Sequence, residues 1–360
     1  MISATDFSTK LHNLRQKLAT LNLDAMLLTF LPDVRWLTKF SGSNGTLLLT
    51  RDNAWLFTDF RYQEQVKIEV EDAVPVITAD GYLAEMKSGK FDFGNRVGFQ
   101  ADKLPFATVE KLKSELPAVE FVPVTMFCEE FVAIKAQDEL EKMRKAVAIT
   151  DKVFEKILDI ISPKVTEREI AAEISYWNKR FGADKDSFDP IVASGARGAF
   201  PHARATDNFI ENNALLVIDM GCVVDGYCSD QTRTVAVGKI DEEARKVYNL
   251  VLEAHLLGIH SAKAGMTGKE LDGIVREFLA AHGYGEAFGH SLGHAVGLQV
   301  HELPIIGRKG EMQIPVGAVI TIEPGVYLPG KFGVRIEDMV LITERGAEPL
   351  PKAPKALIEL

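Results

Sequence analysis

The segment ALLVIDMGCVVDGYCSDQTRTVAVG, residues 214–238, most strongly constrains the fold, because two apolar runs flank a short turn signal and each arm carries an aspartate. This pattern predicts a β-hairpin with a two-residue loop at Asp225-Gly226 or one residue earlier. The earlier loop would place Asp219 and Asp230 directly opposite each other, and the later loop would make them diagonal neighbours. Both registers put the two carboxylates on one face. The run before Asp219 is apolar on both faces, which favours a buried strand over an exposed edge.

Two carboxylates that lie close together in apolar surroundings need a shared proton or a cation between them. A second hairpin pattern, GAVITIEPGVYLPGKFGVRIEDMVLIT (317–343), repeats the arrangement, with Glu323 on one arm and Glu337 on the other. Arg335 lies two residues before Glu337 and therefore shares its face of the strand. Taken alone, this segment is also compatible with a surface ion pair between Arg335 and Glu337 and an exposed Glu323.

A glycine-rich segment with three histidines, GHSLGHAVGLQVHE (289–302), lies between the two hairpins. His290 and His294 have the spacing of a zinc-binding HExxH helix, but the glutamate is missing and glycine recurs at every fourth position, which disfavours a helix. We therefore expect a loop or an irregular strand. Four carboxylates with at least one imidazole favour a pair of hard or borderline divalent ions, Mn²⁺ above all, with Co²⁺ or Zn²⁺ as alternatives.

The rest of the chain shows two different patterns of expected strands and helices. The N-terminal part alternates strand-like runs with helical patterns, which predicts an α/β domain. From Ile134, two long helical patterns precede strand pairs with glycine-rich turns and two more helices, which predicts an α+β domain. We expect residues 1–130 and 131–360 to form the two domains, with a boundary between 125 and 137. Helices are expected over residues 6–22, 106–115, 134–161, 162–182 (with a capping box at Thr166 and Glu169), 241–263 and 267–282.

Composition narrows the function classes. The 360-residue chain has a formal net charge of −10 and no cluster of lysine and arginine, which argues against nucleic acid or an anionic membrane as a partner. The first residues contain no continuous apolar run, so we expect no secretory signal. Three cysteines do not make a disulfide framework, and Cys222 and Cys228 should point to opposite faces of the first hairpin. We therefore expect a cytoplasmic protein.

The chain resembles the pita-bread metallopeptidases. The strings DMG, SDQTRT, GHAVGL, IEPG and VRIED look like motifs of that family, and the resemblance covers residues 135–345. FPHARATD (200–207) and VHELP (300–304) resemble its proline-specific branch, aminopeptidase P and prolidase, and FSGSNGTLLLT and LFTDFRY resemble the creatinase-like N-terminal domain of that branch. The implied fold is α+β, with a pita-bread catalytic domain preceded by an α/β creatinase-like domain. Ala295 departs from the glycine of many relatives, which bears on fine specificity rather than on the metal site.

The resemblance also implies a role for each ligand. Asp219 would bind one ion, and His294 and Glu323 would bind the other. Asp230 and Glu337 would bridge the two ions. Glu323 would in addition carry a proton to the leaving nitrogen.

The remaining histidines are assigned to the substrate by the same resemblance. His202, His290 and His301 would line the substrate site, and His202 and His301 would donate hydrogen bonds during catalysis. Arg335 would orient Glu337 or contact the substrate. The catalytic residues implied in this way are Glu323, His301, His202 and Arg335.

The implied reaction is hydrolysis of the Xaa-Pro peptide bond with release of the N-terminal residue, as in an Xaa-Pro aminopeptidase. An Xaa-Pro dipeptidase (prolidase) is the alternative, because the ligand set does not separate the two. More remote alternatives are a creatinase-type amidinohydrolase, which does without the metal ligands, and a catalytically inactive pita-bread binding module, which loses them. The expected partners are a proline-containing peptide as substrate and a second copy of the chain in a homodimer.

Overall fold

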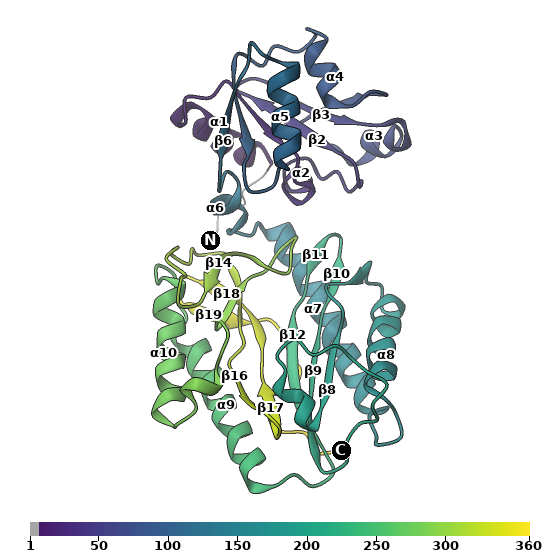
Figure 1. The fold of residues 1–360 in the computed structure, drawn as a ribbon, viewed down its shortest axis with the longest axis vertical. Helices are drawn as coiled ribbons and strands as arrows, with labels where there is room; N and C mark the ends of the chain where they lie inside the picture. Colours follow the sequence, from purple (N-terminus) through teal and green to yellow (C-terminus); the bar gives the residue numbers. More distant parts are fainter. Residues whose placement is uncertain (1–6) are drawn as a thin grey trace. The chain divides into compact units, whose positions relative to one another are not determined.

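The computed structural model describes residues 7–360, which divide into two compact units (Figure 1). One unit ends at Val132, and the other spans Ala133–Leu360. Each unit has its own hydrophobic core. Among the described helices, none combines the length and the apolar composition needed to cross a bilayer.

The N-terminal unit is built on one mixed sheet with the strand order β4-β3-β2-β1-β5-β6. Neighbours β1, β2 and β3 are antiparallel, whereas β4, β5 and β6 each pair in parallel with a neighbour. The parallel pairs need the crossover helices that the alternating sequence pattern predicts. The strands are β1 (Ala25–Leu28), β2 (Thr46–Thr50), β3 (Ala54–Thr58), β4 (Val74–Ile77), β5 (Arg96–Gln100) and β6 (Glu120–Val124).

Helices cover this sheet through apolar stripes. The first helix was predicted over 6–22 and is found at Phe7–Thr20, where Leu14 and Leu18 are fully buried. Leu21, expected on the same stripe, follows the end of the helix and is 38% exposed. The helices are α1 (Phe7–Thr20), α2 (Leu31–Thr38), α3 (Gln65–Glu69), α4 (Tyr82–Lys87), α5 (Phe106–Glu115) and α6 (Glu129–Val132), with a 3₁₀ turn η1 (Phe60–Tyr62).

The C-terminal unit combines antiparallel sheets with the strand orders β12-β9-β8, β11-β10-β7, β14-β13-β15-β18-β19 and β16-β17. Its first strands are β7 (Lys185–Asp186), β8 (Ile191–Ser194), β9 (Ala214–Met220), β10 (Cys222–Val224), β11 (Tyr227–Cys228) and β12 (Gln231–Val237). The later strands are β13 (Gly293–Ala295), β14 (Glu302–Ile306), β15 (Val319–Ile322), β16 (Gly325–Leu328), β17 (Phe332–Arg335), β18 (Asp338–Thr343) and β19 (Gly346–Pro349). The α+β pattern predicted for this part of the chain is therefore correct.

Two helix pairs flank these strands (Figure 1). Helices α7 (Gln137–Leu158) and α8 (Glu167–Arg180) share a core with β8, β9 and β12, and α9 (Glu242–Ser261) and α10 (Gly268–Ala281) share a core with β15 to β18. The capping box predicted at Thr166 and Glu169 starts α8. The remaining elements are the 3₁₀ turns η2 (Gly195–Ala199) and η3 (Gly285–Ala287). The acidic residues of the site lie at or next to the ends of β9, β12, β15 and β18.

Candidate metal centre

The first hairpin has the later of the two predicted registers. Its tip pairs Val224 with Tyr227, so the loop is Asp225-Gly226, and the arms pair Asp219 with Thr232. Both loop residues have positive φ, +48° and +84°, as a tight two-residue hairpin turn requires. Because Thr232 lies two residues after Asp230, the two aspartates are diagonal neighbours on one face, as this register predicts.

The same register separates the cysteines. Cys228 pairs with Val223, so it lies on the face opposite to that of Cys222. Cys128, Cys222 and Cys228 all carry free, buried thiols. Burial raises the pKa of Cys228 to about 12, so this thiol is not poised as a nucleophile.

The second hairpin places its two glutamates opposite each other. Ile322 pairs with Asp338, and Gly325 pairs with Arg335, so the residues between them, Glu323 and Glu337, face one another. They lie where the hairpin passes from the sheet of β15 and β18 to the sheet of β16 and β17. The proline after Glu323 has no N–H to donate, which interrupts the ladder at this point. The side chain of Glu323 is 17% exposed.

The two hairpins meet along β12. The Glu337 amide donates to the carbonyl oxygen of Thr232 at 3.1 Å, and the Arg335 amide donates to the hydroxyl of Thr234 at 3.1 Å. The Thr232 hydroxyl donates to Glu337 Oε2 at 2.7 Å. These bonds bring the carboxylate pair of one hairpin against the pair of the other.

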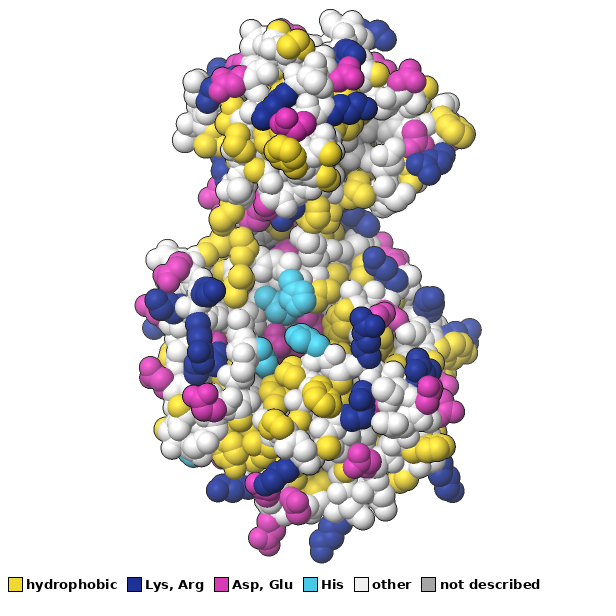
Figure 2. Space-filling view, viewed as in Figure 1, with side chains coloured by type: hydrophobic (Ala, Val, Ile, Leu, Met, Phe, Trp, Pro, Cys, Tyr) yellow, Lys and Arg dark blue, Asp and Glu magenta, His cyan; other side chains and the backbone are white. Residues whose placement is uncertain are grey.

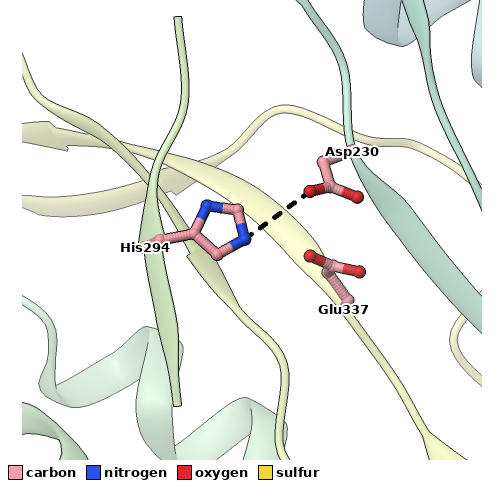
Figure 3. A group of neighbouring side chains, drawn as sticks. All are labelled: Asp230, His294 and Glu337. Carbon is pink, nitrogen blue, oxygen red and sulfur yellow. Dashed lines mark ion pairs between the residues drawn. The ribbon is translucent and has the colours of Figure 1, made fainter. Parts of the chain in front are cut away.

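His294 completes the cluster from β13. Its Nε2 atom lies 3.4 Å from Glu323 Oε1 and 3.7 Å from Asp230 Oδ2. Asp230, His294 and Glu337 each present a ligand atom, and these atoms lie within 4.8 Å of one another (Figure 3). The glycine-rich segment is largely a loop around the short strand β13, whose pairing breaks after His294; a loop or an irregular strand was expected.

Asp219 is oriented by Arg335. Arg335 Nη2 donates to Asp219 Oδ2 at 2.7 Å, whereas Asp219 Oδ1 is buried and has no hydrogen-bond partner among residues 7–360. A buried carboxylate oxygen without a partner is costly, and a cation would satisfy it. The donor set of carboxylates and one imidazole therefore fits divalent metal ions.

The pKa shifts of the cluster also favour bound cations. Burial, reinforced by the neighbouring carboxylates, raises the pKa of Asp230 and Glu337 well above the usual range. Burial alone would lower the pKa of His294, but Glu323 and Asp230 outweigh it and raise that pKa to about 9. Burial alone would raise the pKa of Glu323, but His294 outweighs it and lowers that pKa to about 2. Without a cation, protons must compensate part of the carboxylate charge.

The structure shows which groups Arg335 contacts. Arg335 was expected to orient Glu337 or to contact the substrate; its Nε donates to the Thr232 hydroxyl at 3.1 Å, and that hydroxyl donates to Glu337. Its direct carboxylate partner is Asp219. Arg335 Nη1 also donates to the hydroxyl of Tyr327 at 2.8 Å. Neither Thr232 nor Tyr327 was predicted from the sequence. For Thr232 the available signal was its position two residues after Asp230 on a strand.

The remaining histidines lie around the cluster. His290 Nε2 forms a hydrogen bond with the Tyr327 hydroxyl at 2.9 Å, and the His301 ring contacts the His294 ring with centroids 4.2 Å apart. His202 is exposed and contributes to lowering the pKa of His290 and of His301. Burial lowers the pKa of both His290 and His301, which favours their neutral forms. Figure 2 shows histidine side chains around acidic ones in a hollow of this unit.

The methyl group of Ala295 lies in the hydrophobic core and is fully buried. It therefore does not occupy the space between the histidines, where a substrate would approach.

The family follows from these features together with the sequence matches. Residues 141–344 match metallopeptidase family M24, and residues 10–134 match the creatinase/prolidase N-terminal domain. The chain belongs to metallopeptidase family M24 and carries the N-terminal domain of creatinases and prolidases.

Individual relatives match over nearly the whole chain. An Xaa-Pro dipeptidase of Pyrococcus horikoshii is 39% identical over 342 residues, which cover 94% of this chain and 95% of that protein. The structure of an Xaa-Pro dipeptidase from Bacillus anthracis has a TM-score of 0.95 at 37% identity and covers 99% of this chain and 100% of its own. An X-Pro aminopeptidase from Thermotoga maritima has a TM-score of 0.88 at 35% identity, with 94% and 98% covered. The predicted two-domain fold is thus confirmed.

Proposed function

We propose that this metallopeptidase uses two divalent ions, Mn²⁺ by preference, to hydrolyse the bond before proline and to release the N-terminal residue. The observation that carries the proposal is the convergence of four carboxylates from two hairpins and of His294 from β13, with Asp219 Oδ1 buried and unsatisfied among the described residues. Asp219 would hold one ion, His294 and Glu323 the other, and Asp230 and Glu337 both. Burying these carboxylates costs free energy unless cations compensate their charge, which favours a metal-binding enzyme over a catalytically inactive binding module.

The bond before proline sets a specific chemical task. Its nitrogen carries no hydrogen, so a peptidase has no N–H to bind there, and the nitrogen must be protonated in order to leave. Bound divalent ions would activate water and polarise the scissile carbonyl. Glu323, whose low pKa keeps it ionised at neutral pH, would accept a proton and pass it to the leaving nitrogen.

Three further residues would bind the substrate around this centre. His301, beside His294, and His202, on the loop whose Pro201 carbonyl accepts from Arg335, would donate to the carbonyl oxygen and to the proline side of the substrate. Arg335 would position Asp219 rather than touch the reacting bond. His290, held by the Tyr327 hydroxyl, would form a wall of the substrate site.

An Xaa-Pro dipeptidase is the second candidate, because relatives of similar identity carry both names. The metal-free protein, reloaded with Mn²⁺, would be given Ala-Pro and Ala-Pro-Ala. We expect both to be cleaved, with alanine released from the tripeptide. Cleavage of Ala-Pro alone would support the dipeptidase, and cleavage of neither by the loaded protein would refute proline specificity.

A variant tests the centre itself. Glu323→Ala should abolish turnover in a protein that is still folded by circular dichroism. Near-normal activity of this variant would contradict the proposed role of Glu323.

We also propose that the protein acts in the cytoplasm as a homodimer. Its free thiols suit a reducing compartment, and the family resemblance supports the dimer. Light scattering after size-exclusion chromatography should give about twice the chain mass of 39.7 kDa; a monomer would contradict the dimer.

A further inference from the structure

The segment that joins β8 to β9 carries His202 and is held from two sides. We call residues 194–206 of this segment the His202 loop; it begins at the last residue of β8 and includes η2. His202 itself is exposed, and its imidazole forms no hydrogen bond or ion pair with any other residue between 7 and 360. The position of His202 is therefore set by the backbone of the loop, and its ring nitrogens are available to a ligand.

One side of the loop lies against the candidate metal centre. The backbone oxygen of Pro201 accepts a hydrogen bond from Arg335 Nη1 at 3.1 Å, and Nη2 of the same arginine donates to Asp219 at 2.7 Å. A Cβ placed on Gly333 of β17 would lie 1.9 Å from the backbone oxygen of Gly198, so the two backbones approach more closely than a side chain at position 333 would allow. These contacts fix the side of the loop that faces the centre.

The other side of the loop is held by a buried carboxylate at the start of α8. Glu167 is the first residue of this helix, and its side chain is fully buried. Its Oε1 accepts from the Ser194 amide at 3.0 Å, and its Oε2 accepts from the amide and the hydroxyl of Thr206 at 3.0 and 2.7 Å. One carboxylate thus joins the first and the last residue of the His202 loop.

Arg197 completes this anchor from within the loop. Its Nε lies 3.0 Å from both carboxylate oxygens of Glu167, and its Nη2 donates to the backbone oxygen of Arg204 at 2.6 Å. A buried carboxylate is costly unless a cation compensates its charge, so the two residues of the ion pair depend on each other. The pair also connects the parts of the loop before and after His202.

Stabilisation of α8 is the alternative role for Glu167, because a carboxylate in the first turn interacts favourably with the helix dipole. The start of α8 is already capped without Glu167, however. The Thr166 hydroxyl accepts from the Glu169 amide at 3.2 Å, and Glu169 Oε2 accepts from the Thr166 amide at 2.7 Å. All hydrogen bonds that the Glu167 carboxylate accepts within residues 7–360 come from the His202 loop.

Building on the proposed function, we propose that Glu167 and Arg197 are positioning residues of this peptidase. Their ion pair holds the His202 loop against the start of α8, and through the loop it sets the position of His202 beside the metal centre. Neither residue of the pair touches the substrate, so each acts on the reaction through His202.

The kinetics of substituted proteins test this role. The Mn²⁺-loaded proteins would be assayed with Ala-Pro and Ala-Pro-Ala. Glu167→Gln and Arg197→Gln should each lower kcat/KM about 10- to 100-fold, because a displacement of about 1 Å in a group that contacts the substrate has an effect of this size. The loss should appear in the same constant, kcat or KM, that His202→Ala changes. Arg197→Lys keeps the charge and should lose less activity than Arg197→Gln.

The side chain of Arg197 is 26% exposed, so its variants test the ion pair even if Glu167→Gln fails to fold. Near-normal kcat/KM in the folded Arg197→Gln protein would overturn the positioning role.

A double-mutant cycle with His202→Ala separates positioning from a general structural effect. In a protein that already carries His202→Ala, Glu167→Gln should lower kcat/KM by less than about twofold. The Mn²⁺ affinity of the Glu167→Gln protein, measured by calorimetric titration, should stay within about threefold of the wild type, since the ion pair of Arg335 with Asp219 does not involve Glu167. Equal losses of kcat/KM in the two backgrounds, or a loss of metal affinity as large as the loss of activity, would contradict the proposal.

Hydrogen exchange of the metal-free protein gives a readout that does not need activity. Glu167→Gln should speed the exchange of amides in the His202 loop about tenfold or more, while the amides of residues 171–180 in α8 keep their wild-type rates. The matched control is Arg168→Gln, which removes an ion pair with Asp207 beside the same helix start. The side chains of that pair are 61% and 81% exposed, so the control should change kcat/KM by less than about twofold and leave the exchange of the loop unchanged.

The outcomes separate this proposal from the proposed function. If the wild type cleaves a peptide but Glu167→Gln keeps near-normal kcat/KM, or if exchange speeds up throughout α8, the positioning role is wrong while the proposed function stands. If the loaded wild type cleaves neither peptide, the proposed function fails and the role of the ion pair in that reaction fails with it. The exchange experiment then still decides whether Glu167 holds the His202 loop.

Discussion

At the scale of the residue, the buried carboxylates of the candidate metal centre destabilise the metal-free folded state at neutral pH. The pKa of Asp230 is raised well above its usual value by burial, so the folded state binds this proton more tightly than the unfolded state. The metal-free protein should therefore lose stability as the pH rises above the unfolded pKa of about 4. Bound cations would reverse the effect, because they favour the ionised carboxylate.

The substitution Asp230→Asn tests the predicted loss of metal-free stability with rising pH. Without metal at neutral pH, the variant should be more stable than the wild type by about 1 kcal/mol or more, since one pKa unit corresponds to about 1.4 kcal/mol. The difference should shrink towards pH 4. Mn²⁺ at about a hundred times its dissociation constant should stabilise the wild type by about 2.7 kcal/mol and the variant far less. Urea unfolding measures both effects.

The control for this comparison is Asp159→Asn, because the side chain of Asp159 is 75% exposed and its one ion pair within residues 7–360 is with Lys156. Asp159→Asn should change neither the stability of the metal-free protein nor the stabilisation by Mn²⁺ by more than a few tenths of a kcal/mol. A metal-free Asp230→Asn protein that is less stable than the wild type at neutral pH would contradict the interpretation.

Thr232 is a second residue whose effect can be isolated. Its buried hydroxyl accepts from Arg335 and donates to Glu337, so it connects two charged groups of the centre. Thr232→Val keeps the shape but removes this connection, and metal affinity should fall about 10- to 100-fold, as for other residues that orient ligands. Calorimetric titration with Mn²⁺ measures the change. Thr234→Val is the matched control, since its hydroxyl bonds the backbone of Arg335, and its metal affinity should stay within about threefold of the wild type.

At the scale of the element, the loop between β13 and β14 depends on a buried ion pair. Lys135 Nζ lies 2.8 Å from Glu302 Oε2, and these side chains are only 2% and 4% exposed. The other oxygen of Glu302 accepts from the Gln299 amide at 3.1 Å. A Cβ at Gly297 would lie 2.4 Å from Glu302 Oε2, so the loop that carries His301 closes tightly on this carboxylate.

Lys135→Met and Glu302→Gln, alone and together, test the pair. Each single change should destabilise the protein by about 3–5 kcal/mol, because a buried charge loses its counter-charge, and the double variant should recover part of that loss. Urea unfolding of the four proteins gives the coupling energy, expected at about 1–3 kcal/mol. The exposed pair Lys331 and Glu243 is the control, with an expected coupling below about 1 kcal/mol. Equal coupling in the two cycles would show that burial adds nothing.

The same scale shows what could be predicted from the sequence. The parity of strands predicted that Asp219 and Asp230 share a face, and the second hairpin pattern put Glu323 and Glu337 on its two arms, because those relations are local to one hairpin. The bond between Thr232 and Glu337 joins different hairpins, and the bond between His290 and Tyr327 joins a loop to a strand 37 residues away. Such contacts depend on how the sheets pack against each other, and the local alternation of apolar and polar residues does not determine that packing. For the same reason the ion pair of Arg335 with Asp219 was not predicted.

At the scale of the whole molecule, metal binding should act on one unit alone. The proposed metal ligands all lie after Ala133, and the core of the N-terminal unit, which includes Leu27 and Leu48, contains none of them. A ligand stabilises only the part of a protein whose folded form it binds. Differential scanning calorimetry in chelator and in Mn²⁺ should therefore show one transition that rises with the metal and one that does not.

Two core substitutions identify those transitions. Leu27→Ala in the N-terminal core and Leu216→Ala on β9, in the core that β9 shares with α7, each empty a fully buried site and should cost about 2–5 kcal/mol. Leu27→Ala should lower the metal-insensitive transition, and Leu216→Ala should lower the metal-sensitive one. If Mn²⁺ instead raises a single transition that both substitutions lower, the two units unfold as one cooperative block, and the metal then stabilises the N-terminal unit through its coupling to the catalytic one.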